Sequence, residues 1–338
     1  MSKITIREVA RLANVSPSAV SIVLNDKKGV SDTTRKKVMD IVNQLGYAPN
    51  PSSRRLLFNK TNNIAILFQK NTSPLEHYFY SEINTAVLRE CEDKGYNLIF
   101  ASFVVEKNEV SFPNLIKSYD VDGIIFYGDV DALVLSSLAK YDIPYIVIDN
   151  HTLLPEILSV SADYLHAAYV SVSHLIQLGH KKIAYIGNGL LTNFSTQTFS
   201  GYQKAIAETN ISAPVQWIQF DASQEETAYR CMKNILSCPQ RPTAVFCCAD
   251  IYAIGAINCI KDFKLKVPDD FSVSSIDDII LARYTDPTIT TVKIDKGEIG
   301  KKAINLLIDK INGLSVSSIT IKSDQLIIRK STKKYYES

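Results

Sequence analysis

Long apolar runs are missing from this sequence of 338 residues. No apolar run approaches the roughly 18 residues that a membrane span needs. The chain also passes through Lys3 directly into a polar helix, without the apolar core of a signal peptide. We therefore expect a cytoplasmic protein. Its apolar fraction of 46% and charged fraction of 21% predict a globular chain, and its length predicts two or three domains.

Motifs for metal binding and catalysis are also missing. The six cysteines lack paired metal-ligand spacing, so we expect reduced, buried thiols, with disulfide switching as the alternative. No Ser/His/Asp or Cys/His arrangement stands out. Gly187-Asn188-Gly189 follows a strand pattern as a dinucleotide loop would, but the third glycine is absent. We therefore predict no enzyme, no cofactor and no metal site. His180 lies in a Gly-His-Lys turn and is expected to be structural.

The N-terminal stretch has the pattern of a helix-turn-helix. A first helix is expected over about Ile6–Ala13, because its apolar residues recur at helical spacing. After a turn at Asn14, Ser16 is a good N-cap and Pro17 suits the first helical position. The second helix should run to about Asn25. A third is expected over about 32–45, capped by Ser31 and ended by Gly46.

These residues carry a family resemblance. The matching motifs are Thr5-Ile6-Arg7-Glu8-Val9-Ala10, Val15-Ser16, Val20-Ser21, Val23-Leu24-Asn25, Leu45-Gly46-Tyr47 and Pro49-Asn50. The segment resembles the headpiece of the LacI/GalR family of transcription regulators. That resemblance implies an all-α, three-helix DNA-binding domain over residues 1–48 and a hinge helix over residues 49–60.

The charge distribution independently indicates DNA binding. Residues 1–60 hold 11 lysines and arginines against four acidic residues, a net charge of +7. The whole chain is +2, so residues 61–338 carry about −5. A basic end on a mildly acidic body is typical of phosphate binding by one module.

The second helix of such a motif enters the major groove and reads bases with its first residues. Base-reading candidates here are Pro17, Ser18 and Ile22. The family usually has arginine where this chain has Ile22, and an isoleucine either touches an apolar group such as a thymine methyl or reaches no base. The further candidates for DNA contact in the headpiece are Thr5, Ser16, Ser21, Asn25, Thr34 and Lys37.

The hinge segment has two interpretations. Asn50 can cap a short helix that begins at Pro51. The resemblance implies that this helix folds on the operator and that Leu56 wedges into a base step of the minor groove. It also implies contacts from Asn50, Ser53 and Arg54. The alternative is an interdomain linker whose leucines cover core surface.

From Asn62 onward, strands alternate with helices, and the apolar runs predict parallel sheets covered on both faces. Two α/β units in series indicate two lobes. Motifs such as Leu178-Gly179-His180, Gly201-Tyr202, Asp277-Asp278 and Thr290-Thr291-Val292 resemble the family's periplasmic-binding-protein-like core.

The resemblance implies an effector-binding and dimerisation core over residues 61–330. Lobe one is expected over about 61–153 and 289–315, and lobe two over about 154–288 and 316–330. The three crossings between lobes are then expected near residues 149–156, 287–290 and 313–318. Residues 331–338 are expected to form a frayed tail.

Ligands bind where strand ends face each other across such a cleft. The resemblance places effector contacts at Phe79, Tyr80, Asp149, Thr198, Asp250 and Asp277. Each acid has a structural alternative, since Asp250 and Asp277 are both able to cap a helix. Thr198 stands where the family usually has an arginine, and Ala249 where it often has an asparagine. The family's usual ligands therefore do not carry over.

The combined pattern predicts a sequence-specific transcriptional regulator, in the first instance a repressor. Its operator affinity would change when a small molecule, such as a sugar or sugar derivative, binds between the lobes. The expected partners are a palindromic double-stranded operator in the nucleoid, the effector and a second copy of the chain, with a protein corepressor as a further candidate. The alternatives are a solute-binding protein of the same core fold and a nucleotide-dependent enzyme of the doubly wound class.

Overall fold

The computed structural model describes residues 4–24, 28–47, 60–151, 156–209, 211 and 213–336. The chain divides into two units, Met1–Thr61 and Asn62–Ser338. Within the described residues, no helix is both long and apolar enough to cross a bilayer.

The first unit is a three-helix headpiece. Its helices are α1 (Ile6–Ala13), α2 (Pro17–Leu24) and α3 (Asp32–Leu45). Thr5 and Glu8 form a reciprocal capping box at the start of α1, and Asn14 ends that helix in the left-handed conformation. The three helices surround a small core in which Val9, Val20 and Val38 are fully buried. The predicted helices are confirmed within the described residues; Asn25 lies outside them.

The second unit contains two lobes, each built on its own sheet. The sheet of lobe one has seven strands in the order β12-β6-β5-β4-β1-β2-β3. Its strands are β1 (Asn63–Gln69), β2 (Asn97–Glu106), β3 (Glu109–Ser111), β4 (Gly123–Tyr127), β5 (Tyr145–Ile148), β6 (Ser159–Ala162) and β12 (Ile319–Ile321). Its helices are α5 (Tyr78–Asp93), α6 (Asn114–Lys117), α7 (Ala132–Ala139) and α12 (Lys296–Ile311). All strand pairs are parallel except β2 with β3.

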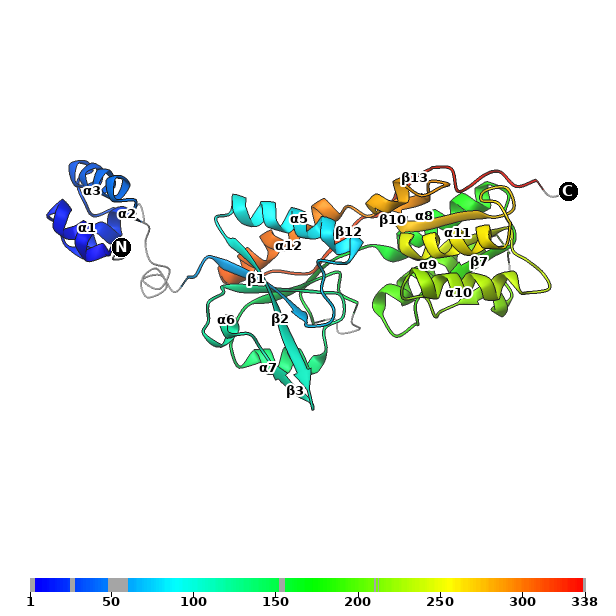
Figure 1. Ribbon diagram of the computed structural model, residues 1–338, viewed down its shortest axis with the longest axis horizontal. Helices are drawn as coiled ribbons and strands as arrows, with labels where there is room; N and C mark the ends of the chain where they lie inside the picture. The colour runs from blue at the N-terminus through cyan, green and yellow to red at the C-terminus, as the bar shows by residue number, and fades with distance from the viewer. Residues whose placement is uncertain are drawn as a thin grey trace. The chain divides into compact units, whose positions relative to one another are not determined.

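Both faces of this sheet are buried, as the apolar runs predict. In β1, Ile64 and Ile66 join the core beneath α5 and α12, whereas Ala65 and Leu67 join a second core beneath α6 and α7. The two helix layers on opposite sides of the sheet are visible in Figure 1. Successive side chains of a strand point to opposite faces, so a continuous apolar run is what a doubly covered strand requires.

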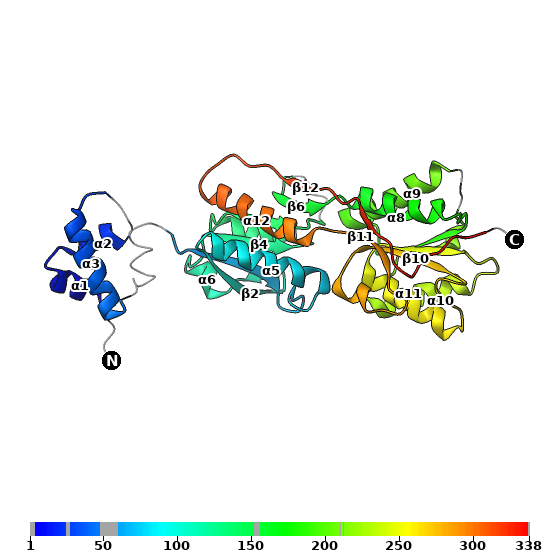
Figure 2. The same cartoon turned by 90° about the horizontal axis from the view of Figure 1, so that it is seen from above.

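The sheet of lobe two has six strands in the order β13-β11-β10-β9-β7-β8. Its strands are β7 (Ile183–Ile186), β8 (Ile218–Gln219), β9 (Ala244–Cys247), β10 (Ser272–Asp277), β11 (Thr290–Lys293) and β13 (Gln325–Ile327), and only β13 is antiparallel to its neighbour. Its helices are α8 (Tyr164–Gln177), α9 (Asn193–Ala207), α10 (Glu225–Leu236) and α11 (Asp250–Asp262), with 3₁₀ turns at Val215–Trp217 and Ile280–Arg283. Figure 2 shows α8 and α9 on one side of β10, and α10 and α11 on the other. The predicted fold class is thereby confirmed.

The crossings between lobes lie later in the chain than the sequence predicts. Because β6 pairs with β5 and β12 in lobe one, the first crossing follows Ala162. Because β11 pairs with β10 in lobe two, the second follows Lys293. The third separates β12 from β13 and therefore follows Ile321. The expected crossings near residues 149–156, 287–290 and 313–318 are wrong for this reason.

Several element boundaries also differ from expectation. The sequence missed β6 and the β2–β3 hairpin, in which Val105 pairs with Val110. The residues 215–220 by themselves predict a strand, but only Ile218–Gln219 is one, after a 3₁₀ turn over Val215–Trp217. The sequence by itself predicts a helix only from Ser200, but α9 begins at Asn193, because Thr192 caps it and accepts a hydrogen bond from the amide of Ser195.

The C-terminal segment is docked rather than frayed. The amide of Tyr335 donates to the backbone oxygen of Leu178 at 2.7 Å, and the Tyr335 ring stacks on His180 with centroids 5.3 Å apart. The amide of Lys333 donates to Ser272 Oγ at 3.1 Å. Burial lowers the pKa of His180 to about 4, so the imidazole is neutral beneath this segment. The structural role expected for His180 fits these contacts.

Candidate functional site

The start of α2 is the exposed part of the helix-turn-helix. Ser16 Oγ accepts a hydrogen bond from the amide of Ala19 at 3.1 Å, which fixes the first turn. Pro17 and Ser18 are exposed. Ile22 is half-buried, and an added Cβ at Gly29 would lie 3.8 Å from Ile22 Cδ1. The first two residues of α2 are therefore accessible to a DNA groove. The side chain of Ile22 is less accessible, because it packs partly against the headpiece near Gly29.

The other predicted DNA contacts are spread over the headpiece. Thr5 Oγ1 accepts from the amide of Glu8 at 3.4 Å, and Thr34 Oγ1 lies 2.9 Å from Ser31 Oγ. Both hydroxyls therefore belong to helix caps. Ser21 is half-buried on α2 and Lys37 is exposed on α3. The remaining candidates lie outside the described residues: Asn25, Asn50, Ser53, Arg54 and Leu56.

A cavity of about 990 Å³ in the core is lined by residues of both lobes. Lobe one supplies the residues at the ends of β1, β4 and β5, such as Gln69, Tyr127 and Asp149. Lobe two supplies Asn188 after β7 and Asp277 at the end of β10. The carboxyl ends of parallel strands from two sheets therefore converge, which is the usual place of a ligand in α/β folds. We call this cavity the cleft.

Aromatic rings form the wall of the cleft on lobe one. Phe79 and Tyr80 lie in the first turn of α5, and the Tyr80 ring lies 4.7 Å from that of Tyr127 and 4.6 Å from that of His77. Tyr127 Oη donates to Asn84 Oδ1 at 2.7 Å, which holds this ring in place. Phe79 and Tyr80 thus line the cleft as predicted.

The carboxylate of Asp149 lies at the centre of a hydrogen-bond network. It accepts from Tyr164 Oη at 2.5 Å and Tyr80 Oη at 3.3 Å, and Asp149 Oδ2 lies 2.9 Å from His151 Nε2. Burial alone would raise the pKa of Asp149, but the charge of His151 and these hydrogen bonds hold it below its usual value. Asp149 lines the cleft but is largely satisfied within the protein, so its main effect is to orient His151 and two tyrosines.

His151 also links the two lobes. Its ring stacks on that of Phe194 in α9, with centroids 5.3 Å apart, and its backbone oxygen accepts from the amide of Asn193 at 2.7 Å. The Tyr164 ring meets Phe194 edge-on at 4.7 Å. Burial would lower the pKa of His151, but the charge and hydrogen bond of Asp149 raise it, so the imidazole favours its charged form.

Asp277 faces the cleft with fewer partners. The residue is 8% exposed and has a positive φ of 120°. Its carboxyl group accepts a hydrogen bond from the backbone amide of Asp250. Within the described part of the chain, no side chain donates a hydrogen bond to it. Burial and the neighbouring charge of Asp250 raise the pKa of Asp277 well above its ordinary value. The protonated carboxyl group, which can both donate and accept a hydrogen bond, is therefore favoured relative to an exposed aspartate.

Two predicted effector contacts lie behind the cleft instead of in its lining. The carboxylate of Asp250 is fully buried and accepts from Ser275 Oγ at 2.5 Å and from the amide of Ile279 at 2.8 Å. Burial raises its pKa to about 6. Thr198 is also fully buried, and its hydroxyl donates to the backbone oxygen of Ser195 at 3.1 Å. Thr198 Oγ1 also lies 3.2 Å from Tyr185 Oη on β7, so both side chains join neighbouring elements. As effector contacts, Asp250 and Thr198 stay predictions.

Sequence reasoning missed His151, Tyr164 and Phe194. Tyr164 and Phe194 lie on lobe-two helices, and the sequence pattern gave no reason to bring them to a lobe-one strand end. His151 lies two residues after Asp149, so its position beside a predicted contact was the available signal.

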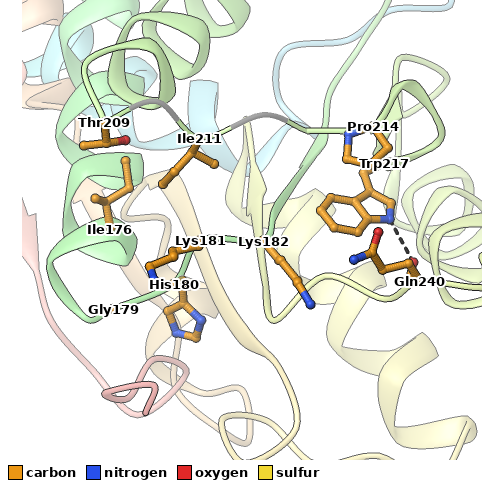
Figure 3. Close-up of a pocket in the computed structure, with 10 residues that line it drawn as sticks. All are labelled: Ile176, Gly179, His180, Lys181, Lys182, Thr209, Ile211, Pro214, Trp217 and Gln240. Carbon is orange, nitrogen blue, oxygen red and sulfur yellow. Dashed lines mark hydrogen bonds between the residues drawn. The ribbon is translucent and has the colours of Figure 1, made fainter. Parts of the chain in front are cut away.

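A second hollow, of about 550 Å³, lies in lobe two beside the turn from α8 to β7. Figure 3 shows Trp217 on its wall donating from Nε1 to the backbone oxygen of Gln240. His180 Nδ1 lies 2.9 Å from Thr243 Oγ1, and His180 Nε2 lies 3.0 Å from Ser272 Oγ. The buried polar groups of this hollow are therefore satisfied by the protein, and we give it no ligand.

A helix-turn-helix joined to a two-lobed core with a ligand cleft defines a ligand-responsive DNA-binding regulator. The family model described as "Bacterial regulatory proteins, lacI family" matches residues 5–50. The model described as "Periplasmic binding protein-like domain" matches residues 172–332. The HTH-type transcriptional repressor PurR of Mannheimia succiniciproducens is 32% identical over 336 residues, which cover 98% of this chain and 99% of that protein. The chain belongs to the lacI family of bacterial regulatory proteins.

Solved structures show the same fold. The lac repressor dimer bound to operator and the anti-inducer ONPF aligns with a TM-score of 0.81 at 23% identity, covering 98% of this chain and 100% of that chain. The transcription regulator CcpA of Lactococcus lactis aligns with a TM-score of 0.71 at 26% identity, covering 80% of this chain and 99% of that chain. By its family and by its match to a repressor over 98% of the chain, this chain is a DNA-binding transcriptional repressor whose activity is modulated by an effector, as the sequence predicts.

Proposed function

We propose that the chain represses transcription as a homodimer on a palindromic operator. The second helix of each headpiece enters the major groove, where Pro17 and Ser18 face the bases. Ser16, Ser21, Thr34 and Lys37 then lie near phosphates. A two-fold dimer reads a two-fold site, so each headpiece occupies one half-site.

The single observation that carries this proposal is the exposed, well-capped start of α2 within a segment of net charge +7. Phosphate contacts supply affinity and orientation, and the exposed first residues of the helix supply sequence readout. The lac repressor, which aligns over nearly the whole chain, is described as a dimer bound to operator. Asn25, Asn50, Ser53, Arg54 and Leu56 complete the proposed DNA contacts on the basis of sequence alone.

The cleft is the proposed effector site. We place Phe79 and Tyr80 against a ring of the effector and Asp277 against one of its polar groups. Tyr164, His151 and Phe194 lie at the junction of the lobes, so a ligand in the cleft is able to favour one lobe arrangement over another. A ligand changes operator affinity only through such a difference in its own affinity for two states.

Two features of the proposed regulation have alternatives. The effector either releases the operator or strengthens its binding. A protein corepressor would act from outside the cleft, so substitutions in the cleft would leave its effect intact.

Selection of binding sites from random duplex DNA by the purified full-length protein tests the DNA-binding part of this proposal. We expect a palindromic site whose half-sites are spaced for a two-fold dimer. A variant with Ser18→Glu places a negative charge at the start of α2 and should lose the site through repulsion from phosphates. Enrichment of a site without two-fold symmetry, or unchanged selection by the variant, would contradict the proposal.

A further inference from the structure

The lining of the cleft has an unusual charge composition. Among the described residues that form it, none is an arginine or a lysine. Five are carboxylic acids: Glu76, Asp129, Asp131, Asp149 and Asp277. A site for a phosphate or a carboxylate is normally furnished with arginine or lysine donors. The lining is therefore poorly suited to an anionic ligand.

Positive charges near the cleft are already held by groups of the protein. Lys296 lies 5.6 Å from the centroid of the Phe79 ring, and its Nζ donates to the backbone oxygens of Asp277 at 2.6 Å and Asp278 at 3.3 Å. The charge of His151 is paired with Asp149. Burial lowers the pKa of the remaining histidine, His77, which favours the neutral imidazole.

One carboxyl group in the lining, that of Asp277, has the charge of Lys296 nearby but is not hydrogen-bonded to it. Asp277 is more than nine-tenths buried, and in the described part of the chain no cationic side chain is bonded to its carboxyl group. Burying a carboxyl group without a counter-charge is unfavourable for its ionised form. A cation in the cleft would provide that counter-charge.

The aromatic wall offers a second attraction for a cation. The Tyr80 ring lies 4.6 Å from the His77 ring and 4.7 Å from the Tyr127 ring, and Phe194 of lobe two also lines the cleft. The face of an aromatic ring attracts a positive charge, by about 2 kcal/mol when both groups are desolvated. Rings combined with acidic groups are the usual way in which proteins recognise organic cations.

We propose that the effector is a small organic cation whose charge lies on, or directly beside, a planar ring. The ring packs against Tyr80 and Tyr127, and the charged group reaches Asp277. This inference rests on the proposed role of the cleft as the effector site.

Binding of such a cation should be coupled to loss of a proton from Asp277. The titratable groups that face Asp277 are Asp250 on α11, Lys296 on α12, Asp149 after β5 and Tyr164 on α8, together with Cys248 and Tyr252. Burial and the charge of Asp250 raise the pKa of Asp277, which favours a proton on this carboxyl group, and a bound cation would favour its loss. The affinity for a cation should therefore increase with pH, while that for a neutral ligand should not.

Three probes of nearly equal shape but different charge show whether the cleft prefers a cationic, a neutral or an anionic ligand. Benzamidine, benzamide and benzoate share one planar ring and are cationic, neutral and anionic. Ligand-observed NMR titrations on the full-length protein measure each dissociation constant. We expect benzamidine to bind at least about fivefold more tightly than benzamide, a difference of roughly 1 kcal/mol, and benzoate to bind most weakly.

Matched variants locate the interaction. In Asp277→Asn the side chain keeps its size and tolerates a positive φ, and benzamidine should lose its advantage over benzamide. Tyr127→Leu, which removes one ring, should weaken both probes. Asp309→Asn alters an exposed acid of α12 and is the control that should change neither.

Equal or tighter binding of benzamide or benzoate would overturn the proposal, as would an undiminished benzamidine preference in Asp277→Asn. Failure of all three probes to bind would also overturn it. These results are independent of operator binding. If the protein prefers the cationic probe but no ligand changes its operator affinity, the proposed class of ligand would stand. The proposed role of the cleft as the effector site would then be wrong.

Discussion

The ion pair of His151 with Asp149 makes the stability of the core depend on pH. The pKa of His151 is raised in the folded state, so its contribution is complete below its ordinary pKa of 6.5 and is lost as pH rises through the folded value. The pKa of Asp149 is lowered, so its contribution is complete above its ordinary value of 3.8. The pair therefore stabilises the fold most between these two values.

We expect His151→Gln to destabilise the protein more at pH 6 than at pH 9. The additional loss at pH 6 should be about 1 to 2 kcal/mol, because a charged hydrogen bond becomes a neutral one. Thermal unfolding at both pH values measures it. His166→Gln, on α8, is the matched control. A loss that is the same at both pH values would contradict the ion pair.

Ile22→Arg tests the readout by α2. An arginine at this position is long enough to donate to guanine O6 and N7, so the preferred half-site should shift toward guanine, with a discrimination of about 1 to 3 kcal/mol. Site selection with the variant and the wild type measures the shift. An unchanged site profile would mean that residue 22 does not read bases.

At the residue scale, the sequence could predict which side chains lie at the ends of strands. It could not predict which of these side chains line the cleft and which are bonded within the protein. Phe79, Tyr80, Asp149 and Asp277 line the cleft as expected. Asp250 follows β9 in a similar sequence setting, yet Ser275 and the amide of Ile279 occupy its carboxylate. That difference depends on a contact between distant segments, which one sequence does not reveal.

At the scale of helices, α8 and α9 pack closely because Gly201 has no side chain. A Cβ at this position would lie 2.2 Å from the backbone oxygen of Leu165 and 2.8 Å from the Cβ of Ala168. We expect Gly201→Ala to destabilise the core by about 2 to 3 kcal/mol, because the helices must separate. Chemical denaturation measures the change.

Gly189→Ala is the control for that experiment, since nothing lies within 4 Å of its added Cβ. It should change the free energy of unfolding by less than about 0.5 kcal/mol. Equal effects of the two substitutions would show that close packing at Gly201 does not limit the fold.

Apolar periodicity predicted most strands and helices, because β1, β4 and β9 are continuous apolar runs. It missed β6, whose sequence is Ser-Val-Ser-Ala. This strand is short and rich in serine, and it pairs with β12, which lies about 160 residues later. The pairing is non-local, so no window of sequence contains it.

At the scale of the whole molecule, three crossings join the lobes, and the cleft lies where both lobes contribute. The sequence predicted two lobes but placed each crossing too early, because strand order depends on pairing between distant segments. The chain leaves the headpiece into lobe one, because β1, the first strand after the headpiece, belongs to the sheet of that lobe.

Leu56→Ala tests the proposed link between the core and DNA. The resemblance to the family predicts that Leu56 wedges between base pairs, an interaction made only at a specific, bent site. The variant should therefore lose much more affinity for the selected operator than for random duplex DNA. Competition binding at one fixed salt concentration measures both losses, and equal losses would remove the wedge.

The most direct test of the central claim is the operator affinity of the full-length protein with and without small molecules from cells that produce it. Fluorescence anisotropy with the selected operator gives the dissociation constant before and after addition of the dialysable fraction of an extract. We predict a change of at least about fivefold, and a smaller change in Asp277→Asn. An affinity that the fraction leaves unchanged, or an equal response in the variant, would contradict regulation through the cleft.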